Sequence, residues 1–344
     1  MDLGGRWQRA HGADGGQIMN ILVTGATGFL GEHAVKLLAD AGEHQITTFA
    51  RSTSPILREL DVKQVRGDIT QGEELVSALK DCDTVLHLAG MVSRDPDDSQ
   101  LMMRIHVDGT RRIYKCAAAA GVRRIVVSSS SGTIAVSKEA VVHDENDPYK
   151  EELVGGWAYY TSKIYQERIA FQMGKELGLD TVVVNPSLLL GPGDRRLSST
   201  KDVQRFLRGQ TPVVPTGGIN FVDARDAAAA TVNAISMGRA GHRYLLGGPN
   251  WSCEEFLNRL GRAAQKTSPR FKLPGKLQEI GAGLIEEAFK AFGQIPPVDR
   301  ISAEMGQHHW WCDSSKAEKE LEFKQREPSI TLHDTIKYLR QGLL

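Results

Sequence analysis

The chain has 344 residues, of which 42 are basic and 42 are acidic, so it carries no net charge that would attract nucleic acid or an anionic membrane. No apolar run approaches the ~18 residues that a membrane span requires. The four cysteines show no C-x-x-C spacing, which favours free thiols in a reducing, cytoplasmic environment over disulfides. The first 18 residues are glycine-rich and lack an apolar segment, so we expect a flexible tail and not a signal peptide.

From Met19 onward, strands and helices alternate along the chain. The predicted strands are short runs rich in Val, Ile and Leu, as expected for strands that are buried on both faces. The predicted strands cover 21–24, 45–50, 61–65, 83–89, 124–128 and 181–185. The first predicted helix follows the first strand and includes Leu37, and the other predicted helices cover 72–79, 98–120 and 158–176. This alternation predicts the α/β class, with a doubly wound parallel sheet covered by helices on both faces. In such sheets, ligands bind beyond the carboxyl ends of the strands, where the strand order reverses.

The first predicted strand ends in the turn T-G-A-T-G-F-L-G (24–31), which leads directly into a predicted helix. Gly25 allows the tight turn, Gly28 lets the backbone approach a pyrophosphate, and Gly31 lets the helix pack closely. The free N–H groups at the helix N-terminus attract phosphate oxygens. Because the glycines stand between a strand and a helix, they predict a dinucleotide site.

The end of the second predicted strand distinguishes between the two nicotinamide dinucleotides. A site for NAD usually has Asp or Glu at this point, to bind the ribose 2′-hydroxyl. This chain has Arg51 and Ser52, with no acidic residue beside them. A guanidinium pairs with a 2′-phosphate, which a carboxylate would repel, so we expect NADP(H) in preference to NAD(H).

Together with later motifs, this turn resembles the extended short-chain dehydrogenase/reductase superfamily, of the epimerase/dehydratase type. The matching stretches are R-G-D-I-T (66–70), H-L-A-G (87–90), H-V-D-G-T (106–110), V-V-S-S-S-S-G-T (126–133), N-P-S-L-L-L-G-P-G-D (185–194), F-V-D-A-R-D-A-A (221–228), R-Y-L-L-G-G (243–248) and D-S-S-K-A-E-K-E-L (313–321). The resemblance covers nearly the whole chain from Met19 on, and it implies an NAD(P)-dependent enzyme that acts on CH–OH groups. It also implies a set of cofactor contacts: Gly25, Thr27, Gly28, Phe29, Leu30, Gly31, Arg51, Asp68, Ile69, Leu88, Ala89, Gly90, Tyr159, Lys163 and Pro186.

The stretch W-A-Y-Y-T-S-K (157–163) contains the Y-x-x-x-K pattern of this superfamily. Residues four apart on a helix are neighbours, which selects Tyr159 with Lys163, whereas Tyr160 would point into packing or toward substrate. The resemblance implies that Tyr159 exchanges a proton with the substrate, and that Lys163 lowers the pKa of this phenol and holds the nicotinamide ribose. Among the four serines after the fifth strand, it selects Ser130 to bind the substrate oxygen, with Ser129 as the alternative.

Two activities and one non-catalytic role have to be weighed within the superfamily. Epimerases and dehydratases of nucleotide sugars carry R-x-x-N-x-x-G-P, in which the Asn meets the diphosphate. Here Asn185 stands at the Arg position and Leu188 at the Asn position, which disfavours a nucleotide sugar. Pro186 followed by an apolar run is similar to dihydroflavonol 4-reductases and 3β-hydroxysteroid dehydrogenases. We therefore expect an oxidoreductase that reduces a hydrophobic ketone or aldehyde, or catalyses the reverse. The alternatives are an NAD-dependent nucleotide-sugar epimerase or dehydratase, and a non-catalytic NADP-binding sensor or assembly factor.

The resemblance also implies the domain organisation, in which a Rossmann sheet carries a smaller mixed C-terminal lobe for substrate. We expect a tail at 1–18, a cofactor domain at 19–190 with a return near 219–247, and a substrate lobe made of 191–218 and 248–344. Apolar residues at helical spacing over 276–292 predict an amphipathic helix, interpreted as a lid. The superfamily's habit implies a homodimer.

Two histidine features call for an interpretation. His106 replaces the superfamily's usual Asn, and it would either take part in a proton relay or pack under the active site. In H-H-W-W-C (308–312), adjacent histidines cannot both face one ion on a strand, so we expect no metal there. Trp310 and Trp311 are interpreted as part of the substrate wall or the core.

Overall fold

The computed structural model describes residues 18–269, 271, 280–284, 287 and 300–344. Its centre is a seven-stranded sheet with the strand order β3-β2-β1-β4-β5-β6-β9, in which every neighbouring pair is parallel. The strands are β1 (Asn20–Thr24), β2 (Gln45–Ala50), β3 (Lys63–Arg66), β4 (Thr84–His87), β5 (Arg124–Ser128), β6 (Asp180–Pro186) and β9 (Arg243–Leu246). The strand order reverses between β1 and β4, so the ligand crevice is expected at their carboxyl ends.

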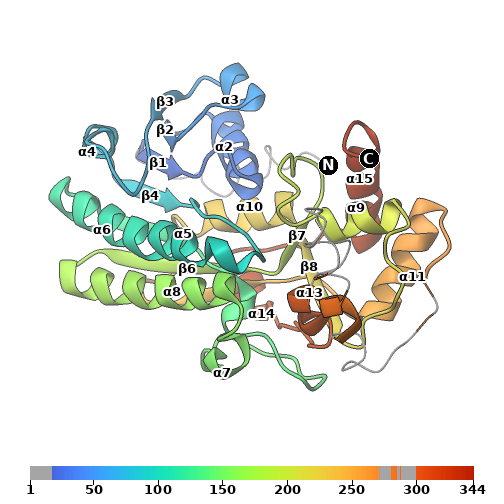
Figure 1. Ribbon diagram of the computed structural model, residues 1–344. Helices are drawn as coiled ribbons and strands as arrows, with labels where there is room; N and C mark the ends of the chain where they lie inside the picture. Colours follow the sequence, from blue (N-terminus) through green and yellow to red (C-terminus); the bar gives the residue numbers. More distant parts are fainter. Residues whose placement is uncertain (1–17, 270, 272–279, 285–286, 288–299) are drawn as a thin grey trace.

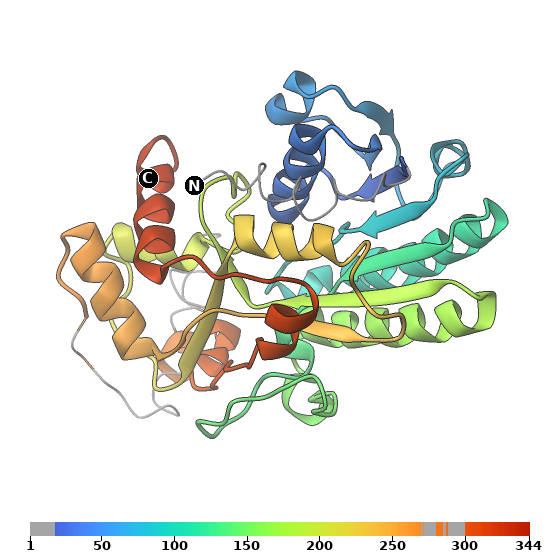
Figure 2. The same ribbon diagram turned by 180° about the vertical axis from the view of Figure 1, so that it is seen from behind.

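Helices cover both faces of this sheet (Figures 1 and 2). Side chains alternate along β1, so that Ile21 and Val23 pack with α2 (Phe29–Ala41) and α10 (Ala224–Asn233). Leu22, between them, faces the opposite layer of α4 (Glu74–Ala78), α6 (Gly109–Ala119) and α8 (Ala158–Leu177). The predicted fold class is therefore confirmed, and its physical basis is the burial of the central strands β1, β4, β5 and β6 on both faces.

The long helix predicted at 98–120 is present but not uniform. It consists of α5 (Ser99–Met103), a π-helical turn at Arg104–Asp108 and α6. Such π-turns often occur at functional sites. This one contains His106, which is completely buried.

A smaller mixed sheet stands beside the main one. Its strand order is β10-β8-β7, with β8 (Gly218–Asp223) antiparallel to β10 (Asn250–Ser252) and parallel to β7 (Leu188–Leu190). Around it lie α9 (Lys201–Leu207), α11 (Cys253–Ala264), α13 (Arg300–Met305) and α15 (Pro328–Arg340), while α14 (Ser315–Glu320) lies near β9 (Figure 1). The remaining short elements are α3 (Pro55–Glu59), η1 (Pro96–Asp98), η3 (Ser131–Thr133) and α7 (Glu151–Val154).

Two predicted segments fall largely outside the described residues: the tail, apart from Ile18, and most of the amphipathic helix at 276–292. Within the second segment, residues 280–284 and 287 are helical. The predicted domain boundaries remain predictions. Among the described residues, no helix combines the length and the apolar character that a membrane crossing needs.

Candidate active site

The glycine turn lies at the reversal point between β1 and β4. Gly25 has φ +69°, and a Cβ on it would lie 2.5 Å from the backbone nitrogen of Ala89. A Cβ on Gly31 would lie 2.2 Å from the Gly25 carbonyl oxygen, so both positions exclude any side chain. Gly28 is the N-cap of α2 and provides no side-chain cap for the first N–H groups of this helix. An uncapped helix N-terminus without intervening side chains fits a pyrophosphate.

The other residues of the predicted cofactor contacts surround this turn. Phe29 and Leu30 are buried in the first turn of α2, and Thr27 is half-buried. Leu88 and Ala89 follow β4 and are half-buried, whereas Gly90 is exposed. Pro186 is buried at the end of β6, where it pairs with β9. Ile69 is buried in the core, and its side chain occupies the space that a Cβ on Gly109 would need.

The carboxyl ends of β2 and β3 bring two arginines together. Arg51 is exposed just after β2, and its carbonyl oxygen accepts a hydrogen bond of 2.9 Å from Nε of Arg66 at the end of β3. Partial burial raises the pKa of Asp68, but hydrogen bonds from Thr70 and the Arg51 charge lower it more, and the net shift is downward. Sequence reasoning named Arg51 but missed Arg66, which only the pairing of β2 with β3 brings alongside.

Ser130 and Tyr159 meet at the end of β5. The Ser130 side chain lies close enough to the Tyr159 phenol to lower its pKa, whereas the Ser129 hydroxyl is turned away and donates to Glu167 at 2.5 Å. Burial raises the pKa of Tyr159, the neighbouring Tyr160 adds to this shift, and the Ser130 hydrogen bond opposes it. We expected the Lys163 charge to lower this pKa, but in the chain itself burial dominates, so the phenol stays protonated.

Lys163 lies one helical turn after Tyr159, with its side chain buried. Its Nζ donates to the carbonyl oxygen of Ser128 at 3.0 Å and to Oε1 of Gln166 at 2.8 Å. Burial lowers the pKa of Lys163 to about 7, and the charge of Glu167 opposes this shift. A Cβ on Gly90 would lie 3.5 Å from this nitrogen, so the ammonium borders the loop after β4.

A buried carboxylate that sequence reasoning missed holds the serine loop in place. Glu167, on α8 one turn after Lys163, is fully buried. Its Oε1 accepts hydrogen bonds from Ser129 Oγ at 2.5 Å, Thr133 Oγ1 at 2.8 Å and Asn185 Nδ2 at 2.7 Å, and its Oε2 accepts one from Tyr149 at 3.3 Å. The spacing of Tyr159, Lys163 and Glu167 places them on one helix face, and this spacing could have identified Glu167 from the sequence.

His106 is held by neutral partners on both sides of its ring. The backbone N–H of Met91 donates to its Nε2 at 3.0 Å, so Nδ1 carries the proton and donates to Ser162 Oγ at 2.8 Å. The Ser162 hydroxyl donates onward to the carbonyl oxygen of Tyr159 at 2.6 Å. Burial and the charge of Lys163 hold the pKa of His106 well below its ordinary value. Through these hydrogen bonds His106 connects the loop at Met91 to Ser162 on α8, an arrangement that favours a structural role over a proton relay.

Aromatic rings border the Tyr159 phenol on one side. The Tyr160 ring lies 5.0 Å from the Tyr159 ring and stacks at 4.9 Å on Trp310, which in turn lies 5.5 Å from Trp157. Gly132 makes room for this stack, because a Cβ there would lie 2.2 Å from the Tyr160 ring. Trp311 donates from Nε1 to the Trp251 carbonyl and lies outside the stack. Within the residues that the structure describes, no group of three or more potential metal ligands occurs.

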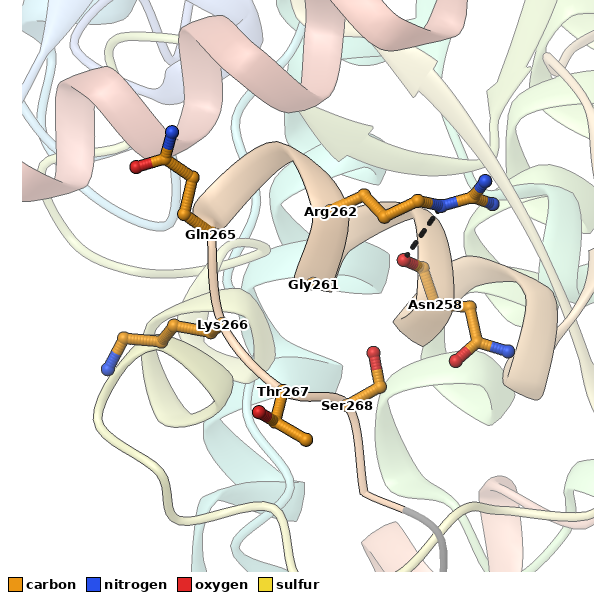
Figure 3. Close-up of a pocket in the computed structure, with 7 residues that line it drawn as sticks. All are labelled: Asn258, Gly261, Arg262, Gln265, Lys266, Thr267 and Ser268. Carbon is orange, nitrogen blue, oxygen red and sulfur yellow. Dashed lines mark hydrogen bonds between the residues drawn. The ribbon is translucent and has the colours of Figure 1, made fainter.

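A separate, open hollow of about 580 Å³ lies at the end of α11 (Figure 3). Its lining residues are Asn258, Gly261, Arg262, Gln265, Lys266, Thr267 and Ser268. None of them belongs to the main sheet, to the glycine turn or to α8, so this hollow is distinct from the candidate active site.

Comparison with known proteins identifies the family. The model of the NAD dependent epimerase/dehydratase family matches residues 21–247, which is more than half of the chain. The chain belongs to this family. It is thus an enzyme of the extended short-chain dehydrogenase/reductase type, as the motifs implied.

Two relatives and one solved structure illustrate the range of the likeness. A protein named putative dihydroflavonol 4-reductase from Synechocystis sp. is 32% identical over 92% of this chain and 94% of its own length. Cinnamoyl-CoA reductase 1 from Oryza sativa subsp. japonica is 32% identical over 79% of this chain and 82% of its own. In fold, the chain is similar to UDP-glucuronic acid 4-epimerase from Bacillus cereus in complex with NAD, with a TM-score of 0.72, 19% identity, and coverage of 94% of this chain and 99% of that one.

Proposed function

We propose that this protein is an NADP(H)-dependent oxidoreductase that reduces a hydrophobic ketone or aldehyde to the alcohol, or catalyses the reverse reaction. The observation that carries the proposal is the proximity of the Ser130 side chain to the Tyr159 phenol, whose pKa it lowers against the effect of burial, with the buried side chain of Lys163 one helical turn after Tyr159. Two hydroxyl groups that converge on one point are suited to hold a carbonyl oxygen and to protonate it.

The residues at the switch point fit a dinucleotide. The glycines of the turn leave the N-terminus of α2 open to the pyrophosphate, and Lys163 would hold the ribose hydroxyls of the nicotinamide half. When bound, NADPH supplies the hydride for the carbonyl carbon.

The chain's own residues handle the oxygen and the proton. Ser130 donates a hydrogen bond to the substrate oxygen and stabilises the negative charge that develops on it. Tyr159 gives its phenolic proton to that oxygen, and the nearby Lys163 ammonium stabilises the phenolate that remains. In the reverse direction, the phenolate accepts the proton of the alcohol.

Preference for NADP(H) is supported by the two arginines after β2 and β3. The guanidinium of Arg51 is exposed, and that of Arg66 is held beside it by its bond to the Arg51 carbonyl. Two guanidinium groups at the ribose position favour a 2′-phosphate. Asp68, which the Arg51 charge reaches, accepts hydrogen bonds from Thr70 through its Oδ1.

A hydrophobic substrate is supported by the surroundings of the phenol. The partly exposed rings of Tyr160 and Trp310 offer it an aromatic surface. Relatives named dihydroflavonol 4-reductase and cinnamoyl-CoA reductase are consistent with this class. Two residues argue against a nucleotide sugar as substrate. The Asn185 amide is fully buried and donates to Glu167, and Leu188 has no polar group that could bind a diphosphate.

The test begins with the cofactor. The purified protein is titrated with NADPH and NADH by fluorescence, and NADPH oxidation is then followed with a panel of aromatic and alicyclic ketones and aldehydes. Tighter binding of NADPH and its consumption with one or more carbonyl compounds is the expected result. Tightly retained NAD(H) that no carbonyl compound turns over would instead favour an epimerase, and binding of NADPH without any turnover would favour a sensor.

A further inference from the structure

The ammonium group of Lys163 has three N–H donors, and the protein engages two of them. One donates to the Ser128 carbonyl at 3.0 Å and one to Oε1 of Gln166 at 2.8 Å. With these two directions fixed on a tetrahedral nitrogen, the third is fixed as well. A Cβ on Gly90 would lie 3.5 Å from the Lys163 nitrogen, so Gly90 borders it. Gly90 is exposed in the loop that follows β4.

The orientation of the Gln166 amide is not free. Because an ammonium can only donate, the oxygen of this amide must face Lys163 and its nitrogen must face the other way. That nitrogen donates to Thr110 Oγ1 at 3.0 Å. Gln166 and Thr110 are both fully buried, so no water competes for these bonds.

The same chain of hydrogen bonds continues to the glycine turn. Thr110 Oγ1 lies 2.9 Å from Nε2 of His87, and Nδ1 of His87 lies 2.8 Å from Oγ1 of Thr24, the residue before the turn. All members are fully buried, and burial lowers the pKa of His87 to about 3, so the imidazole stays neutral. The chain thereby connects α8 to β4 and β1 through uncharged groups.

The nearby carboxylate does not take the place of Gln166. Glu167 lies one turn after Lys163, and its Oε1 is occupied by hydrogen bonds from the serine loop and from Asn185. Lys163 therefore has a neutral acceptor at hydrogen-bond distance and a negative charge only further away.

We propose that Gln166 is a positioning residue, which aims the third N–H of Lys163 at the cofactor ribose and keeps this ammonium next to an uncharged partner. The inference rests on the proposed function, because that function assigns the ribose hydroxyls to Lys163. Its consequence is that residue 166 sets the pH at which Lys163 loses its proton, and with it the pH dependence of cofactor binding.

The experiment measures the dissociation constant of NADPH as a function of pH for the wild type, Gln166→Met and Gln166→Glu. Methionine removes the acceptor from the ammonium, so we expect binding roughly tenfold weaker and a midpoint of the pH dependence that is shifted downward. Glutamate keeps the acceptor and adds a negative charge, so the midpoint shifts upward. Gln172→Met is the matched control, because Gln172 is exposed on the same helix and bonds only to Glu176 among the described contacts.

Opposite shifts of the two Gln166 variants, with none for the control, support the inference. A residue that merely fills space would weaken binding in both variants without moving the midpoint, and that result would overturn it. Thermal melts show whether each variant is folded. If both are folded, loss of positioning is seen in the affinity for NADPH, which Gln166→Glu is expected to retain at a pH where Gln166→Met does not. If the wild type binds neither NADPH nor NADH, the proposed function itself fails; if it binds NADPH but the midpoints coincide, only the inference fails.

Discussion

Removal of the Glu167 carboxylate should loosen the serine loop and lower the stability of the whole protein. In Glu167→Ala, the hydroxyls of Ser129 and Thr133 and the amide of Asn185 lose their common acceptor inside the core. Each hydrogen bond to a charged group contributes about 1.5–3 kcal/mol, but bonds that share an acceptor do not add independently. The cluster also contains an ion pair, because Nε of Arg243 lies 3.9 Å from Oε2 of Glu167. Loss of one partner from a buried ion pair costs about 3–5 kcal/mol in the free energy of unfolding, and we take about 4 kcal/mol.

This free energy converts into a measurable shift in melting temperature. With an unfolding entropy of about 2.1 cal/mol/K per residue, the 344 residues give about 0.7 kcal/mol/K, so Glu167→Ala should lower Tm by about 6 °C. Glu167→Gln preserves the volume and one acceptor oxygen, and it should lose about half as much. Because Ser130 belongs to the same loop, turnover should fall about 100-fold in the alanine variant.

Calorimetry and NADPH oxidation kinetics test this prediction, with Glu176→Ala as control because Glu176 is exposed on the same helix. A Tm within about 1 °C of the wild type for Glu167→Ala would refute the reasoning, since it would mean that the cluster contributes nothing net to folding.

Four further outcomes follow from the site. Tyr159→Phe should lower turnover by about 10²- to 10⁴-fold while NADPH affinity, measured by fluorescence, is retained; unchanged turnover would contradict the assigned role. Arg51→Ala should weaken NADPH roughly tenfold and leave NADH unaffected, and equal losses for both would disprove the phosphate contact. Gly31→Ala places a Cβ 2.2 Å from a backbone oxygen, so cofactor binding should be lost, whereas Gly156→Ala, with nothing within 4 Å, should bind normally in the same titration. Because burial lowers the pKa of Lys163 to about 7, and the ammonium is the active form, turnover should decline as the pH rises through that value; a flat pH–rate profile would exclude this dependence.

The sequence by itself determined the features that depend on residues close together in the chain. The alternation of apolar strands and helices predicted the parallel sheet, because burial on both faces leaves a direct mark on each strand. The turn at Gly25 and Gly31 was predictable for a similar reason, since the left-handed φ of Gly25 and the contact of Gly31 with the Gly25 carbonyl both belong to the turn itself. The pairing of Tyr159 with Lys163 required only the helical repeat.

Tertiary structure alone decided which neighbours the polar side chains find. The resemblance to the superfamily selected Ser130, but the residue types of four consecutive serines do not by themselves distinguish the one near Tyr159 from the one that faces Glu167, because the choice depends on how the loop after β5 packs against α8. Arg66 reaches Arg51 only because β3 pairs with β2, and Gln166 reaches Thr110 only because α8 packs on α6. Hydrogen bonds are short-ranged and directional, so a buried polar group takes its role from residues that are distant in the sequence and brought within about 3 Å by the fold.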